Sequence, residues 1–190
     1  LTNIADHLLS GLERLGNPMR CAVCLVKPNM RDAISLSAPG LPNEYHQFIE
    51  STPLDPRLTT CGRAIQQRQQ VIIENIAESD LDLQTRQSAA ALGIKAAWSI
   101  PLFNSTNEIV GTFAVYFFEA RQPSAAEMDM ISRATHILTM IIENKQSAEK
   151  VRISNERYLL ATRAANEAIW DWDAEESVSF WGEGFNTLFG

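Results

Sequence analysis

Apolar residues recur along the chain at two different spacings. Near the N-terminus they are three or four residues apart, which predicts an amphipathic helix over residues 1–15. Short apolar segments that predict strands lie at residues 20–27, 33–37, 71–73, 95–103 and 109–118. Short helices are expected between them, at residues 44–50, 61–69 and 83–92. Because the strands pair mainly through hairpins, the pattern predicts an α+β domain whose antiparallel sheet has the terminal helices packed on one face.

The two long segments at residues 95–103 and 109–118 form the best-defined hairpin in the chain. Since side chains alternate between the two faces of a strand, Phe113 and Tyr116 must lie on opposite faces. One face lines a cleft and the other lies under the terminal helices. The sequence leaves open which face is which.

A final helix is expected to begin at Ser124 and to continue to about Asn155. Its apolar positions repeat every seven residues, which predicts a parallel, coiled-coil homodimer through the terminal helices. This seam consists of Met130, Ala134, Ile137, Ile141, Asn144, Ala148 and Val151. The alternative is that the helix covers the sheet through Met128, Ile131, Leu138 and Ile142. The two are compatible, because a helix that is apolar on more than one side needs two partners.

The composition excludes some classes of partner. The net charge is −7 and Lys and Arg form no cluster, which argues against binding to nucleic acid. No apolar run approaches the roughly 20 residues that cross a bilayer, so no membrane contact is expected within this chain. Three cysteines, an odd and sparse set, favour a reducing cytoplasm over a disulfide scaffold.

The cysteines are the main candidates for chemistry. Thr60 is expected to be the N-cap of the helix that follows, which places Cys61 in its first turn, where free N–H groups lower a thiol pKa. A redox or ligand-contact role for Cys61 is one interpretation, and a small buried core residue is the other. Cys21 and Cys24 are three apart on a strand and face opposite sides, so they are expected to fill the core rather than bind metal.

Four segments in a fixed order resemble the GAF domain of bacterial signalling proteins. They are Cys61-Gly62-Arg63-Ala64, VIIENIAESDL, LGIKAAWSIPLF and EIVGTFAVYFF. The resemblance covers residues 1–146. It implies an antiparallel sheet of five or six strands with helices behind it, a ligand cleft in front, and dimerisation through the terminal helices.

The C-terminal part resembles a second family. Glu156-Arg157-Tyr158, then ATRAANEAIWDWDAEE and VSFWGEGFNTLFG, resemble the opening of a PAS domain, which implies an entry helix, two strands and a first short helix. The expected organisation is a GAF sensory domain at 1–146, a coiled-coil-like helical linker at 147–157, and an incomplete, N-terminal PAS fragment at 158–190.

Together the resemblances imply the input module of a signal-transduction protein, such as a two-component sensor histidine kinase, a diguanylate cyclase or a cyclic-di-GMP phosphodiesterase. The catalytic output is expected outside this chain, so the chain itself is expected not to be an enzyme. The candidate contacts for an unknown small-molecule ligand are Tyr45, Cys61, Trp98, Phe113 and Tyr116, with Gly62 and Arg63 as an anion cradle. No bilin-attachment, cyclic-nucleotide or metal motif occurs, which leaves the cofactor unassigned.

Two alternatives to ligand sensing remain at this point. The first is a ligand-free dimerisation module in which the cleft has collapsed. The second is a cysteine-dependent free methionine sulfoxide reductase, an enzymatic branch of the GAF family.

Overall fold

The structure is a computed structural model of the chain, and it describes residues 1–15, 18–165, 170–173 and 178–181. The surroundings of side chains are described as far as residue 161. Contacts within the chain divide it into two units, Leu1–Glu143 and Asn144–Gly190. The first unit holds the candidate site.

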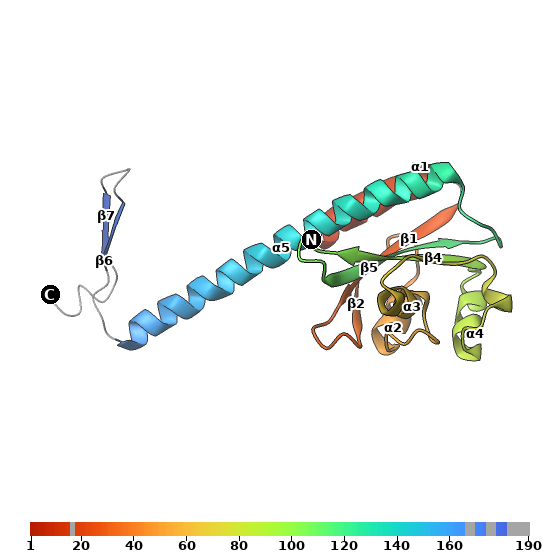
Figure 1. The fold of residues 1–190 in the computed structure, drawn as a ribbon, viewed down its shortest axis with the longest axis horizontal. Coiled ribbons are helices and arrows are strands. Elements are labelled where there is room, and N and C mark those ends of the chain that lie inside the picture. Colours follow the sequence, from red (N-terminus) through yellow and green to blue (C-terminus); the bar gives the residue numbers. More distant parts are fainter. Residues whose placement is uncertain (16–17, 166–169, 174–177, 182–190) are drawn as a thin grey trace. The chain divides into compact units, whose positions relative to one another are not determined.

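The first unit is built on a five-stranded sheet in which every pair of neighbours is antiparallel (Figure 1). Its strands are β1 (Met19–Val26), β2 (Ala33–Ser37), β3 (Val71–Ile73), β4 (Ala96–Phe103) and β5 (Ile109–Phe117), in the order β2-β1-β5-β4-β3. The five strands lie at the predicted positions to within one residue at each end. The antiparallel α+β prediction is therefore confirmed.

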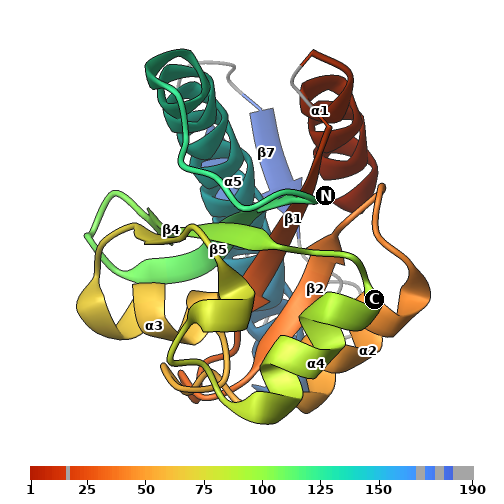
Figure 2. The same ribbon diagram turned by 90° about the vertical axis from the view of Figure 1, so that its right-hand side faces the viewer.

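Helices cover both faces of this sheet. They are α1 (Thr2–Leu15), α2 (Asn43–Ser51), α3 (Thr60–Gln67), α4 (Leu83–Ala91) and α5 (Ala125–Ala165), with a short 3-10 helix η1 (Ile76–Glu78). Figure 2 shows α1 and the first part of α5 over one face, and α2, α3 and α4 over the other. The terminal helices thus share one face, as the sequence predicts.

Under the terminal helices lies a core of large side chains. From the sheet it contains Trp98, Phe113 and Phe117, and from the helices it contains Leu9 of α1 and Leu138 of α5. All five are buried. The rings of Trp98 and Phe117 pack with their centroids 4.2 Å apart. The sequence could not decide whether Phe113 or Tyr116 faces the terminal helices. The structure shows that Phe113 does, since it belongs to the core under these helices.

The opposite face carries smaller side chains. Ala22 and Cys24 of β1, Ala97 of β4 and Ala114 of β5 pack there with Tyr116 and with residues of α2 and α3. Tyr116 is therefore on the side that faces α2, α3 and α4. The side chains on this face are smaller than those under the terminal helices. They leave space between the sheet and the helices α2, α3 and α4.

Local capping explains where several helices begin and end. Thr59, not Thr60, is the N-cap of α3, and its hydroxyl accepts a hydrogen bond from the Gly62 N–H at 2.8 Å. The prediction for Thr60 was wrong because adjacent threonines offer the same capping group. Gly93 follows α4 with φ of 72°, the left-handed conformation in which glycine commonly ends a helix.

The start of α5 is fixed by a reciprocal capping box. The Ser124 N–H donates to Glu127 Oε2 at 2.8 Å, and the Glu127 N–H donates to Ser124 Oγ at 3.3 Å. Arg121 donates two hydrogen bonds to the same carboxylate, at 3.0 and 2.7 Å. Its guanidinium also lies 4.7 Å from the centroid of the Phe117 ring. The end of β5 is in this way tied to the first turn of α5.

The stripe of α5 that faces the sheet differs from the predicted seam. Ile131, Ala134, Leu138 and Ile142 are its buried residues in the core. Ala134 was assigned to the dimer seam, and this assignment was wrong, because Ala134 lies three residues after Ile131 and four before Leu138, and therefore on the stripe that faces the sheet. The helix also extends to Ala165, beyond the predicted end near Asn155.

The second unit contains the rest of α5 and a two-stranded antiparallel sheet. Its strands are β6 (Trp170–Asp173) and β7 (Val178–Trp181), with Trp170 opposite Trp181. They occupy the positions at which the resemblance to PAS domains expects its first two strands. The first short helix expected after them falls outside the described residues.

Replacing Phe113 by Ala should reduce the free energy of unfolding by about 3–5 kcal/mol, because it opens a cavity in the core under the terminal helices. Phe118→Ala is the matched control, since Phe118 is 37% exposed, and its loss should be about 1 kcal/mol. Urea unfolding followed by circular dichroism measures both. Equal losses for the two variants would contradict the assignment of Phe113 to the core.

Candidate ligand-binding site

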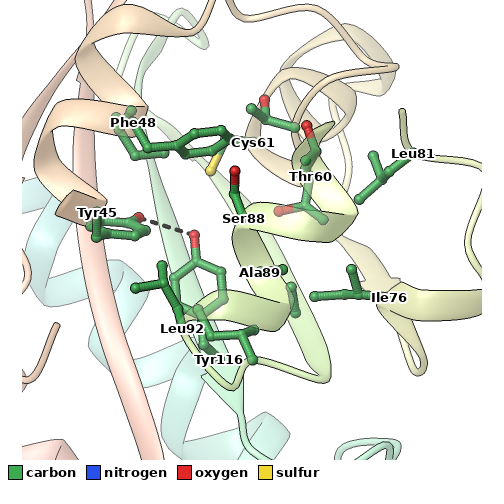
Figure 3. A pocket seen from close by; sticks show the side chains of 15 residues that line it. Tyr45, Phe48, Thr60, Cys61, Ile76, Leu81, Ser88, Ala89, Leu92 and Tyr116 are labelled. Atoms are coloured by element: carbon green, nitrogen blue, oxygen red, sulfur yellow. Dashed lines mark hydrogen bonds between the residues drawn. The ribbon is translucent and has the colours of Figure 1, made fainter. Parts of the chain in front are cut away.

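A cavity of about 50 Å³ lies between the sheet and the helices α2, α3 and α4 (Figure 3). Its lining contains no Asp, Glu, Lys, Arg or His side chain. The walls are apolar residues such as Phe48, Leu81, Ala89 and Leu92, with hydroxyl and thiol groups among them. The lining residues are Tyr45, Phe48, Ile49, Thr59, Thr60, Cys61, Ile76, Leu81, Thr85, Ser88, Ala89, Leu92, Ile94, Ala97 and Tyr116.

Two tyrosines meet on the sheet side of the cavity. The hydroxyls of Tyr45, from α2, and Tyr116, from β5, are 3.0 Å apart and hydrogen-bonded, and their rings meet edge to face at 5.5 Å (Figure 3). Both side chains are buried. Burial raises the pKa of each phenol well above its usual value, so both hydroxyls keep their protons.

Cys61 lies beside this pair in a group of buried hydroxyls. Its sulfur is 3.6 Å from Ser99 Oγ on β4. The Ser99 hydroxyl donates to Thr60 Oγ1 at 2.7 Å. Cys24, from β1, belongs to the same buried cluster. Thr60, Cys61 and Ser99 therefore satisfy one another, whereas the buried hydroxyl of Thr112 has no hydrogen-bond partner.

The two thiols have different acidities as a result. The neighbouring Cys24 thiol, followed by the hydroxyls of Thr112, Ser99 and Thr60, lowers the pKa of Cys61 to about 6, although burial acts in the opposite direction. The interaction with Cys61, together with burial, raises the pKa of Cys24 well above its usual value. Cys61 is thus the thiol that ionises first.

Gly62 and Arg63, the predicted anion cradle, do not line the cavity. A Cβ at Gly62 would lie 2.6 Å from the Asp55 carbonyl oxygen, so glycine is required for the close approach of this loop to α3. The Arg63 guanidinium donates to the Pro56 carbonyl at 3.1 Å and to Asp80 at 2.8 Å. Both residues hold the loop before α3 in place, and their groups are already bonded.

The structure brings together three of the five predicted pocket residues, Tyr45, Cys61 and Tyr116. Trp98 and Phe113 lie on the other face, in the core under the terminal helices, and their assignment to the pocket was wrong. The reason is that β4 and β5 are apolar on both faces, so the alternation of side chains could not show which face lines the cavity. Ligand binding by the remaining three residues stays a prediction.

The sequence analysis missed the wall that α4 provides. Thr85, Ser88, Ala89 and Leu92 line the cavity from α4 and its C-terminal end, yet α4 has no buried residue. Such a helix gives a weak sequence signal, because its small residues bury little apolar area. The run of alanines at 89–91 is the one signal that indicates a closely approaching, lightly packed helix.

Two negative findings concern the described part of the chain. Within it, no group of three or more His, Cys, Asp or Glu side chains is placed to hold a metal ion. Its helices include none that is both long and apolar enough to span a bilayer.

Comparison with known families shows to which family this chain belongs. Residues 1–143 match the family described as GAF domain, with an order of strands and helices that places a cavity on one face of the sheet. The chain belongs to the GAF family. The match ends at residue 143 and does not include the segment that resembles a PAS domain.

This GAF domain is similar to a methyl sulfide methyltransferase-associated sensor of Methanosarcina acetivorans, with 28% identity over 158 residues. The alignment covers 83% of this chain but only 15% of that sensor. The chain therefore spans a small part of the length of this relative.

Solved structures show the same fold at low sequence identity. A domain of a putative two-component sensor histidine kinase from Sinorhizobium meliloti has a TM-score of 0.65 and 16% identity, over 80% of this chain and 97% of that one. A type II free methionine-R-sulfoxide reductase from Thermoplasma acidophilum has a TM-score of 0.59 and 10% identity, over 75% and 92%. The fold thus serves both a sensor and an enzyme.

A double-mutant cycle tests the hydrogen bond between Tyr45 and Tyr116. Tyr45→Phe and Tyr116→Phe should each cost about 1–3 kcal/mol of stability, because each leaves a buried hydroxyl without its partner. The double variant should cost less than the sum of the two, by about 0.5–3 kcal/mol. Urea unfolding measures the cycle, and Tyr158→Phe is the control because Tyr158 is 58% exposed. Strict additivity would show that the two hydroxyls do not interact.

Proposed function

We propose that this GAF domain is the sensory input module of a longer signal-transduction protein and takes a small molecule in the cavity under α4. The observation that carries the proposal is the cavity itself. It has mainly apolar walls and a few hydrogen-bonded hydroxyl and thiol groups. Small-molecule sites commonly combine apolar walls with a few convergent polar groups.

The size of the cavity bears on how a ligand would enter. Sites for drug-sized ligands are roughly 300–1,000 Å³, whereas this cavity is about 50 Å³. A larger ligand therefore requires a wall to move. We assign this role to α4, which buries none of its residues. It is held at its start by hydrogen bonds from Thr85 to the Leu58 carbonyl at 2.6 Å and from Asp82 to the Arg57 carbonyl at 3.0 Å.

The signal would leave the domain through α5, which packs on the opposite face of the sheet and continues to Ala165. Similarity to one sensor and to a domain of a sensor histidine kinase supports this direction. We propose that the output is a histidine kinase, a diguanylate cyclase or a cyclic-di-GMP phosphodiesterase in the reducing cytoplasm. Residues 158–190 would then be the opening of an intervening PAS domain, with β6 and β7 as its first strands.

A cavity-filling variant tests the ligand. We expect the chain isolated under native conditions from its own cells to retain a small molecule in native mass spectrometry. Ala89→Trp, which fills the cavity, should abolish this adduct. The control is Ala91→Trp on the same helix, because Ala91 is exposed and does not line the cavity. A wild-type protein without any adduct would favour the ligand-free dimerisation module instead.

The homodimer is a second part of the proposal. With Ala134 buried against the sheet, the exposed apolar positions of α5 are Ile137, Met140 and Val151, at 44%, 52% and 60% exposure. Together with the exposed Asn144 they form one stripe. The revised seam therefore omits Ala134 and replaces Ile141 by its neighbour Met140. Two such stripes packed in parallel would bury these side chains.

Ile137→Glu should convert the dimer to a monomer, because it places a charge among the apolar side chains of the seam. Ser132→Glu is the control, since Ser132 is an exposed residue of α5 outside this stripe. Sedimentation velocity over a range of concentrations distinguishes the two species. If both variants, or neither, changed the association of the chain, the revised seam would be wrong.

A further inference from the structure

A second hollow, of about 260 Å³, lies beside the cavity and is formed by η1, α4 and the residues that lead into β4. Ile76 and Ile94 line both spaces, so the two are neighbours. Ala90 and Lys95, which also line the hollow, are exposed. The hollow is therefore open to solvent, and a solute can enter it without any movement of the chain.

The charge of this hollow is unusual for the chain. Its lining contains two basic side chains, Arg86 and Lys95, and no Asp or Glu, although the chain has a net charge of −7. Neither takes part in the ion pairs within the described part of the chain. The carboxylate of Asp82, four residues before Arg86, instead caps α4 by accepting a hydrogen bond from the Thr85 N–H at 2.9 Å. Both positive charges of the hollow are thus left unpaired among the described residues.

The guanidinium of Arg86 is held in place but only partly bonded. Its Nη1 donates a hydrogen bond to the Ala77 carbonyl of η1 at 3.2 Å. Its Nε is shielded from solvent and has no hydrogen-bond partner in the described structure. A charged donor that has lost its water without gaining an acceptor is costly. The hollow therefore lacks an acceptor at the Nε side of this guanidinium.

The free edge of Arg86 has the geometry that binds a carboxylate. Since Nη1 is used by Ala77, the edge formed by Nε and Nη2 remains, and its two parallel N–H groups match the two oxygens of a carboxylate. The chain uses the same edge elsewhere. Arg57 donates from Nε and Nη2 to the Asp55 carboxylate at 3.3 and 3.2 Å. Arg152 does so to the Glu149 carboxylate at 2.9 and 2.6 Å.

The remaining groups of the hollow add further donors and an apolar surface. Asn75 accepts a hydrogen bond from the Ala77 N–H with its Oδ1, at 3.2 Å, so its amide nitrogen is available to donate. The ammonium of Lys95 supplies a second positive charge. Ile76 and Ile94 are buried and present apolar side chains. The hollow thus combines convergent N–H donors with an apolar wall, as small-molecule sites commonly do.

We propose that this hollow binds a small aliphatic carboxylate, with both oxygens on the Nε–Nη2 edge of Arg86 and the ammonium of Lys95 beside them. The hydrocarbon part would pack on Ile76 and Ile94. The planar, two-oxygen group favours a carboxylate over phosphate. The volume of about 260 Å³ is below the roughly 300–1,000 Å³ of sites for drug-sized ligands, which favours an acid of a few carbons.

This site does not rest on the proposed occupant of the cavity, because neither Arg86 nor Lys95 lines the cavity. Arg86 belongs to α4, and Lys95 directly precedes β4. A carboxylate shared by the two would join α4 to the edge of the sheet. Since Ala89 of α4 lines the cavity, a bound acid would restrain the wall of the cavity from outside it.

The test is a titration of the ¹⁵N-labelled chain with sodium butyrate, followed by nuclear magnetic resonance of the Arg86 Nε–H group. This signal is identified by its absence from Arg86→Lys. We expect a saturable shift of the signal with butyrate. Sodium chloride at the same ionic strength controls for screening, and sodium phosphate tests the other oxyanion. A shift equal to that in chloride, or tighter binding of phosphate than of butyrate, would overturn the proposal.

Charge variants show whether the hollow itself is the site, with the Gly93 amide as reporter because Gly93 lines the hollow. Arg86→Lys keeps the charge but removes the paired N–H groups, and should weaken butyrate binding at least about tenfold. Lys95→Gln should weaken it several-fold. Lys145→Gln, the same change at an exposed lysine outside the hollow, should not. Equal effects of the two Lys→Gln variants would show only an attraction to net charge and would contradict the site.

A steric pair on α4 leaves both charges intact. Ala90→Trp fills the hollow and should abolish the shift, whereas Ala91→Trp, at an exposed neighbour that does not line the hollow, should leave it unchanged. The spectrum of each variant shows whether it is folded. If Arg86→Lys unfolds, the wild-type titration and this steric pair still decide. Binding of butyrate to Ala90→Trp with wild-type affinity would overturn the proposal, whatever occupies the cavity.

Discussion

The burial of β5 on both faces is the constraint on which the rest of the structure depends. Every residue from Ile109 to Phe117 is buried, and the strand pairs along its length with β1 on one side and β4 on the other. A central strand that is apolar on both sides forces a layer of helices over each face. In this chain α1 and the first part of α5 cover one face of the sheet. The helices α2, α3 and α4 cover the other face.

The two faces differ in side-chain size, and this difference creates the candidate site. Trp98, Phe113 and Phe117 fill the space under the terminal helices. On the other face, Ala97, Ala114 and Cys24 are too small to do so, and the helices cannot close the gap completely. Buried polar groups tend to bond to one another where water is largely excluded, and the hydroxyl pairs Tyr45–Tyr116 and Ser99–Thr60 are the result.

Periodicity predicted the elements of this domain well because each strand and helix has one dominant spacing. It could not choose between Phe113 and Tyr116 for the cavity, since both faces of β5 are apolar. It also placed Ala134 in a dimer seam, because that seam and the stripe that faces the sheet are neighbours on α5, and Ala134 lies where they meet. The hydrogen bond between Tyr45 and Tyr116 joins segments far apart in the chain, so only the fold reveals it. For the same reason the cavity wall from α4 had no counterpart in the sequence pattern.

The path from the cavity to α5 runs through consecutive residues of one strand. Tyr116 faces the cavity, and the next residue, Phe117, faces the terminal helices. The Phe117 ring lies under the Arg121 guanidinium, and Arg121 is bound to Glu127 in the first turn of α5. A displacement of Tyr116 by an occupant of the cavity would shift the backbone that also carries Phe117. Because the core between the sheet and α5 is closely packed, it transmits such a shift instead of absorbing it. The short connection from β5 to the capping box is thus the physical link between a change in the cavity and the position of α5.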